Sequence, residues 1–219
     1  MGTIINKFKN PVSTIIEKSY EEDNKKRAIK LVVISAIMSL INIISIIMGI
    51  VEKISKDSFY YHSYSSSQLW DKRWNAIKEA ELIGKFFSNW IIFAIVILAF
   101  ALILFAINKL LKKDKDYLFN LSLVNNAAII YVIGTILSKI CSLIYLPLGI
   151  LCIYATTIYG GLTLLNAFRD SLELEDSNKL VLVSTGVLVV TMIILVVVMS
   201  SITGVSLKDI TNITELFGM

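Results

Sequence analysis

The chain has 219 residues, of which 56% are hydrophobic and 17% charged, and its formal net charge is +4 at neutral pH. This content is too apolar for an ordinary soluble domain, so a membrane protein is predicted. The lysines are spread over several short loops and form no single basic face, so we expect no nucleic-acid partner.

Residues 1–30 are predicted to form a cytoplasmic amphipathic segment. Apolar residues lie on both sides of the Asn10-Pro11 break, and a helix can begin at Pro11 because its missing N–H is not needed in the first turn. We expect two short amphipathic helices on the membrane surface, helped by lysines that are attracted to anionic lipid.

Five apolar runs are long enough to cross a hydrocarbon layer of about 30 Å as helices. They define a five-span membrane domain over residues 31–204, with spans at approximately 31–51, 89–109, 117–138, 141–166 and 180–204. Unpaired backbone groups are not tolerated in lipid, and these runs lack the alternation of barrel strands. The predicted fold class is therefore all-α, a polytopic membrane helical bundle with five transmembrane helices plus interfacial amphipathic helices.

Residues 52–88 are predicted to form an external loop that contains a helix. Trp70, Trp74 and Ile77 follow a helical spacing after a serine-rich start that can cap a helix. Because Trp and Tyr prefer the headgroup layer, we expect this segment to lie along the outer surface. Residues 205–219 form a short C-terminal tail.

The distribution of basic residues predicts the orientation. If the N-terminus is cytoplasmic, thirteen of the 21 Lys and Arg residues fall in inside segments and eight in outside segments. This bias predicts a cytoplasmic N-terminus and an external C-terminus. The scarcity of arginine and the many Ile and Asn residues suggest an AT-rich bacterial genome, so we expect a bacterial plasma membrane.

The two cysteines both fall in the predicted fourth span. Eleven residues of helix would separate Cys141 from Cys152 by about 16 Å, too far for a disulfide. We therefore expect no redox pair and no metal cluster in the chain.

Polar and small residues inside the spans form the candidate site. Asn125 and Asn126 are adjacent and point about 100° apart on a helix, so they require a broad protein-facing surface. Thr156 and Gly160 form a small-xxx-small pair, which lets neighbouring backbones approach closely. The candidate residues are Ser39, Asn42, Ser122, Asn125, Asn126, Thr156, Gly160 and Asn166.

Two interpretations of these residues stay open. They can hold helices together, each asparagine contributing about 0.6 kcal/mol on average. Alternatively, Asn42, Asn125 and Asn126 line a polar cavity that binds a lipid headgroup or a small solute. The sequence contains no paired acidic motif, histidine cluster, GxSxG or phosphate-binding glycine loop, so we expect neither enzyme activity nor a cofactor.

Three stretches resemble the Yip family, five-span membrane proteins named in eukaryotes for interaction with Ypt/Rab GTPases. They are the Asn10-Pro11 entry followed by Thr14-Ile15, "KDKDYLFNLSLVNNAAIIYVIG", which looks like bacterial members, and "IYGGLTLLNAFRDSLELEDSNKLVLVSTGVLVV". The resemblance implies an integral membrane helical bundle that acts through protein or lipid contacts.

Three functions follow as hypotheses. The leading one is a non-enzymatic membrane protein that organises or recruits partners, namely membrane lipids and a protein of unknown identity. The alternative is a carrier of a small solute or lipid that uses the asparagine cavity. An immunity or stress-resistance protein stays open as a third, and the sequence does not set the oligomeric state.

Overall fold

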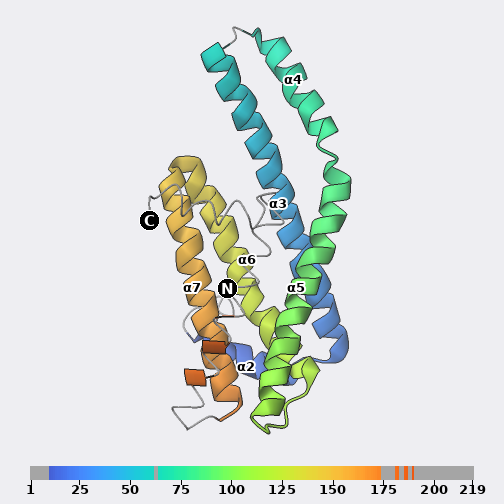
Figure 1. Cartoon of the computed structure of the whole chain (residues 1–219), viewed down its shortest axis with the longest axis vertical. Helices are drawn as coiled ribbons and strands as arrows, with labels where there is room; N and C mark the ends of the chain where they lie inside the picture. The colour runs from blue at the N-terminus through green and yellow to red at the C-terminus, as the bar shows by residue number, and fades with distance from the viewer. Residues whose placement is uncertain (1–9, 62–63, 174–180, 183–184, 187–188, 190–219) are drawn as a thin grey trace, which may run out of the picture.

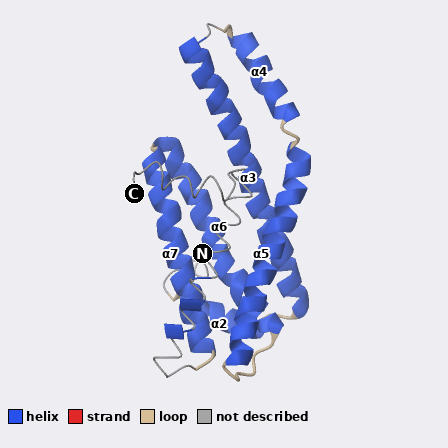
Figure 2. Cartoon of the chain, viewed as in Figure 1, coloured by secondary structure: helices blue, strands red, loops and turns tan. Residues whose placement is uncertain are grey.

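The structure is a computed structural model that describes residues 10–61, 64–173, 181–182, 185–186 and 189 (Figure 1). All regular elements in these residues are α-helices (Figure 2). In chain order they are α2 (Pro11–Glu21), α3 (Asn24–Tyr61), α4 (Ser66–Glu79), α5 (Leu82–Leu110), α6 (Tyr117–Ile144) and α7 (Leu146–Ser171). The predicted all-α fold class is confirmed.

Four of the described helices, α3, α5, α6 and α7, are long and apolar enough to cross a membrane. Successive members run in opposite directions, so that α3 and α6 start at the end of the bundle where α5 and α7 finish (Figure 1). The predicted fifth span at 180–204 lies outside the described residues apart from isolated positions, and the tail at 205–219 lies outside them entirely.

Helix α6 is the centre of the bundle and contacts α2, α3, α5 and α7. The side chains of Leu104 on α5, Leu123 on α6 and Phe168 on α7 are completely or almost completely buried. Large apolar side chains on the outer faces stay exposed, including Ile91 and Leu102 on α5. An apolar exterior around an apolar core is the pattern of a bundle whose solvent is lipid.

Helix α2 lies across the end of the bundle, against α6 and α7 (Figure 1). It begins at Pro11, as predicted, and the Thr14 hydroxyl donates a hydrogen bond to the Asn10 carbonyl at 2.8 Å. Ile15 and Ser19 on its inner face are buried. The apolar face of α2 is therefore covered by protein, whereas the sequence suggested that it would be covered by lipid.

The predicted helix in the loop at 52–88 is α4, and a capping box starts it. The Ser65 hydroxyl accepts a hydrogen bond from the Gln68 N–H, and the Gln68 side chain accepts one from the Ser65 N–H. Rather than crossing the bundle end, α4 runs back along α3, and Arg73 donates a hydrogen bond to the Ser55 hydroxyl at 2.7 Å. This hairpin extends beyond the α6–α7 connection (Figure 1).

The predicted fourth span is wrong at its start. Helix α6 continues to Ile144 and α7 begins at Leu146, so residues 141–166 do not form one helix. Tyr145 is extended at the junction, and Pro147 cannot continue α6 because it lacks an N–H and clashes with the preceding turn. Cys141 and Cys152 therefore lie on two different helices, and the conclusion that they cannot meet is also wrong.

Candidate functional site

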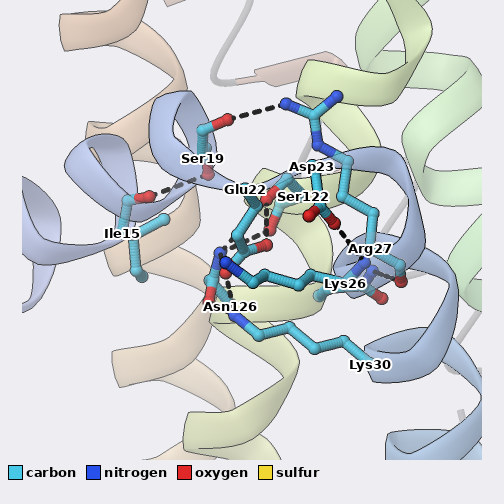
Figure 3. A network of polar contacts seen from close by, with 10 residues as sticks. Ile15, Ser19, Glu22, Asp23, Lys26, Arg27, Lys30, Ser122 and Asn126 are labelled. Atoms are coloured by element: carbon cyan, nitrogen blue, oxygen red, sulfur yellow. Dashed lines mark hydrogen bonds and ion pairs between the residues drawn. The ribbon is translucent and has the colours of Figure 1, made fainter.

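A polar network joins the α2–α3 junction to the first three turns of α6 (Figure 3). It contains Glu22, which directly follows α2, Lys30 in the second turn of α3, and Ser122 and Asn126 on α6. We call these four residues the polar anchor. The helix break that places Glu22 over Lys30 is stabilised by Asp23, whose carboxylate accepts a hydrogen bond from the Lys26 N–H at 2.7 Å.

Every member of the polar anchor bonds to at least two others. Glu22 and Lys30 form an ion pair, and the Ser122 hydroxyl donates to Glu22 Oε2 at 2.6 Å. Lys30 Nζ donates to Asn126 Oδ1 at 2.7 Å, while Asn126 Nδ2 donates to Glu22 Oε1 at 3.4 Å. The Glu22 side chain is only 8% exposed and the Lys30 side chain 27% exposed. A carboxylate this buried requires such partners, because desolvation of an unpaired charge is costly.

The partners of Glu22 change its ionisation. Burial by itself raises the pKa of the Glu22 carboxyl group, because it disfavours the charged form. Hydrogen bonds from Lys30 and Ser122, the charge of Lys30 and a hydrogen bond from Asn126 all lower it. These contacts outweigh burial, so the pKa lies below its ordinary value of 4.5 and the carboxylate is ionised at neutral pH.

A second set of contacts lies beside the polar anchor and connects the same three helices. Asn125 Nδ2 donates to the Arg27 carbonyl on α3 at 3.1 Å. The Arg27 guanidinium in turn donates to the Ser19 carbonyl on α2 at 3.0 Å (Figure 3). The adjacent asparagines thus point to different partners, as their angular separation on the helix requires.

The structure brings together Ser122, Asn125 and Asn126 and leaves Asn42 apart from them. Asn42 is twelve residues beyond Lys30 on α3, which places it about 18 Å further along the helix. It is half-buried and makes no hydrogen bond within the described part of the chain. The three asparagines therefore do not line one cavity in the structure.

The remaining predicted residues are spread along the bundle, and two of them, Ser39 and Thr156, lie at close helix contacts. The Ser39 hydroxyl donates to the Phe86 carbonyl at 2.6 Å and joins α3 to α5. Thr156 meets Gly134 of α6, where an added Cβ would lie 1.9 Å from the Thr156 methyl carbon. At Gly160 an added Cβ would reach only Ile130, at 4.0 Å, so this glycine permits no comparably close approach. Asn166 is half-buried on α7.

An apolar cavity of about 190 Å³ lies between α3, α5, α6 and α7. Its lining is aliphatic and aromatic, and Tyr131 and Thr157 supply its only polar side chains among the described residues. Gly160 and Gly161 form part of the α7 wall. Such a cavity accepts apolar groups and offers no charge for an ion or polar solute.

Sequence reasoning missed Glu22, Arg27 and Lys30. All three fall within residues 1–30, which the sequence predicts as an amphipathic segment on the membrane surface. The sequence signal that could have identified them is the pair Asn125 and Asn126. This pair lies near the start of the third span, which the predicted topology places at the same end of the bundle as Lys30. Within the described residues no group of three or more His, Cys, Asp or Glu could hold a metal ion.

These features define a polytopic α-helical membrane protein whose polar network joins a terminal helix to the bundle. The chain matches the Yip1 domain over residues 10–199. Because this match spans most of its length, the chain belongs to the Yip family. No curated protein and no solved structure matches the chain.

Proposed function

We propose that this protein is a non-enzymatic organiser of a bacterial plasma membrane that recruits a protein partner through α2. In this proposal the N-terminus is cytoplasmic and the C-terminus external. The observation that carries it is that α2 is fixed to the bundle by its inner face and presents a charged outer face. A preformed surface binds a partner at a lower entropic cost than a loose segment.

The fixed position of α2 rests on both packing and polar contacts. Ile15 and Ser19 are buried on its inner face, and the polar anchor holds Glu22 directly after its last residue. The outer face exposes Glu17, Tyr20 and Glu21. This combination of a rigid helix with an exposed aromatic and two carboxylates is suited to a protein surface with complementary basic groups.

The charge of the outer face favours protein over lipid as its partner. Glu17 and Glu21 are repelled by anionic headgroups, which would keep the outer face of α2 out of the lipid surface. Lys112 and Lys113, in the connection between α5 and α6, supply basic charge at the same end of the bundle. We assign lipid contact to these lysines and partner contact to α2.

A polar hollow beside α2 enlarges the proposed docking surface. It has a volume of about 650 Å³, and its walls come from α2, the start of α3, the end of α5, the α5–α6 connection and the start of α6. Arg27, Lys109 and Lys115 line it together with Asp114 and Asp116. A partner segment with both signs of charge fits this lining.

The test is photo-crosslinking in native membranes with a photoreactive residue at Ser13, which is exposed on α2. We expect capture of one discrete protein, and loss of that capture when Glu17→Lys and Glu21→Lys are combined. The matched control is Glu79→Lys on α4, a charge reversal at an exposed residue of the opposite end, which should leave capture unchanged. Capture of lipid alone at Ser13, or capture unaffected by the double reversal, contradicts the proposal.

A further inference from the structure

Two thiols meet near the α6–α7 connection. Cys141 lies in the last turn of α6 and Cys152 in the second turn of α7, and both are free cysteines. Their sulfur atoms are 3.6 Å apart. A disulfide bond is about 2.05 Å long, so the sulfurs need to approach by about 1.6 Å to form one.

The two backbones are held close to each other beside the thiols. The Ser138 hydroxyl, one turn before Cys141, donates to the carbonyl of Gly149, one turn before Cys152, at 2.7 Å. A Cβ added to Gly149 would lie 2.5 Å from the Ser142 Cβ, so only glycine permits this approach. A disulfide requires closely spaced backbones. The backbones of α6 and α7 are already close beside the thiols, so neither helix has to move far for the bond to form.

The thiols lie where a water-soluble reagent can reach them. Both cysteines are half-buried rather than enclosed. Lys139, two residues before Cys141, is exposed, and a lysine ammonium is costly within hydrocarbon. Tyr145 at the junction is also exposed, at 63%. This end of the hairpin is therefore at the membrane–water boundary.

We propose that Cys141 and Cys152 are a reversible oxidation site that covalently joins α6 to α7. The oxidant is a disulfide, from either a thiol–disulfide oxidoreductase or a small molecule. The thiolate of one cysteine attacks the oxidant and expels its first thiolate, leaving a mixed disulfide. The second cysteine thiolate then attacks the protein sulfur of the mixed disulfide, the intramolecular bond forms, and the second oxidant thiolate leaves. The two protons lost by the cysteines are taken up by the two released thiolates.

A disulfide between Cys141 and Cys152 would mainly fix the position of α6 relative to α7. It would have a smaller effect on the conformational entropy of the unfolded chain. Only ten residues separate the two cysteines, so the closed loop is short. The oxidised form holds the end of α6 to α7 and prevents the two helices from sliding or separating there. A thiol reductant reverses the reaction and restores the free pair.

The experiment uses the full chain in nanodiscs, treated with dipyridyl disulfide and analysed by intact mass. We expect the product to lose two hydrogen atoms and carry no bound pyridyl group. It should also lose both sites for maleimide labelling, and dithiothreitol should restore them. A product that keeps bound pyridyl groups overturns the proposal, because the second step then fails although the thiols are accessible. Failure of the reagent to react at all overturns it as well.

Cysteine variants test whether ring closure depends on the positions of Cys141 and Cys152, or whether any two thiols at these helix ends can form the disulfide. In Cys141→Ser the remaining cysteine should keep its pyridyl adduct. The matched control combines Cys141→Ser with Leu143→Cys, which moves the thiol to the opposite side of α6, where Leu143 is 68% exposed. We expect the control to keep its adducts. Equal ring closure in the control and the wild type overturns the assignment to the Cys141–Cys152 pair.

Discussion

Asn125 and Asn126 illustrate how neighbouring residues in one helix acquire different tasks. Asn126 bonds to the Glu22–Lys30 ion pair, and Asn125 bonds to the backbone of α3 at Arg27. Both contacts lie where α2, α3 and α6 meet. An amide is suited to this place because it donates to the carboxylate with its nitrogen and accepts from the ammonium with its oxygen.

Asn126→Leu is expected to destabilise the folded bundle by about 1–3 kcal/mol, because it removes one hydrogen bond from Lys30 and one from Glu22 and places an apolar side chain beside their partly buried ion pair. The measurement is the free energy of unfolding of the purified protein in micelles. The control is Asn42→Leu, which removes an asparagine with no hydrogen bond in the described structure and should have a smaller effect. Equal effects of the two substitutions would show that the polar anchor contributes no particular stability.

The lowered pKa of Glu22 predicts a pH dependence of stability. Because the folded-state pKa lies below 4.5, the ionised carboxylate stabilises the fold fully above pH 4.5. This contribution is lost as the pH falls below 4.5 and through the lowered pKa. We expect the thermal midpoint of the wild type to fall over this range, and Glu22→Gln to remove that part of the dependence.

Thermal unfolding of both proteins in micelles from pH 7 down to pH values of about 3 measures this effect, since carboxylates titrate there. The difference in thermal midpoint between wild type and Glu22→Gln should be largest at neutral pH and should decrease on acidification. The same substitution at the exposed Glu79 serves as the control and should leave the midpoint at neutral pH unchanged. If this difference in thermal midpoint does not change with pH, the ionised Glu22 carboxylate is not its cause.

At the scale of elements, α6 and α7 form the closest helix pair. Their backbones approach at Gly134, opposite Thr156, and again at Gly149, opposite Ser142. Small residues permit this approach, which replaces the hydrophobic drive that is missing between helices in lipid. Gly160 belongs to the same stripe of small residues, but it faces the apolar cavity and makes no comparably close contact.

Gly134→Ala is therefore expected to destabilise the α6–α7 pair by about 1–3 kcal/mol through overpacking against Thr156. Thr156→Ala in the same chain should recover part of this loss, because it removes the atoms nearest the added methyl group. Free energies of unfolding for the two single variants and the double variant measure this coupling. Gly160→Ala, the matched control, should be neutral or slightly stabilising, because alanine has the higher helix propensity.

If Gly160→Ala destabilises the protein as much as Gly134→Ala, the closest approach is not at Gly134. If Thr156→Ala gives no recovery, the added methyl group is not opposed by Thr156.

At the scale of the whole molecule, the two ends of the bundle differ. One end carries α2, the polar anchor and the lysines between α5 and α6, and the other carries the projecting α3–α4 hairpin (Figure 1). Trp70 and Trp74 on α4 are exposed, at 65% and 49%. The proposed orientation places the α2 end in the cytoplasm and α4 outside the cell.

Single cysteines introduced at Asn75 and Lys113 test this orientation in a chain that also carries Cys141→Ser and Cys152→Ser. We expect a membrane-impermeant maleimide to label Asn75→Cys in intact cells. Lys113→Cys should react only after the cells are permeabilised, because its loop lies at the basic end. A cysteine at Glu17 on α2 should behave like the one at Lys113. The reverse labelling pattern would invert the proposed topology.

Much of the architecture was predictable from local sequence. Long apolar runs must be helical in lipid, Pro11 begins α2, and a serine-rich start caps α4. The boundary between α6 and α7 was not predicted correctly: Pro147 marks it, but the apolar run continues through the turn and hides it. Hydropathy measures whether residues enter the membrane and carries little information on where one helix stops and the next begins.

The sequence by itself determined that this is an all-α membrane protein, because composition and periodicity depend on residues that are near each other in the chain. Only the tertiary structure decided which polar and sulfur-containing residues meet. Glu22 and Asn126 lie 104 positions apart in the chain, and Cys141 and Cys152 meet because the chain reverses direction between them. Such contacts depend on how α6 packs against its neighbouring helices, which no local pattern encodes.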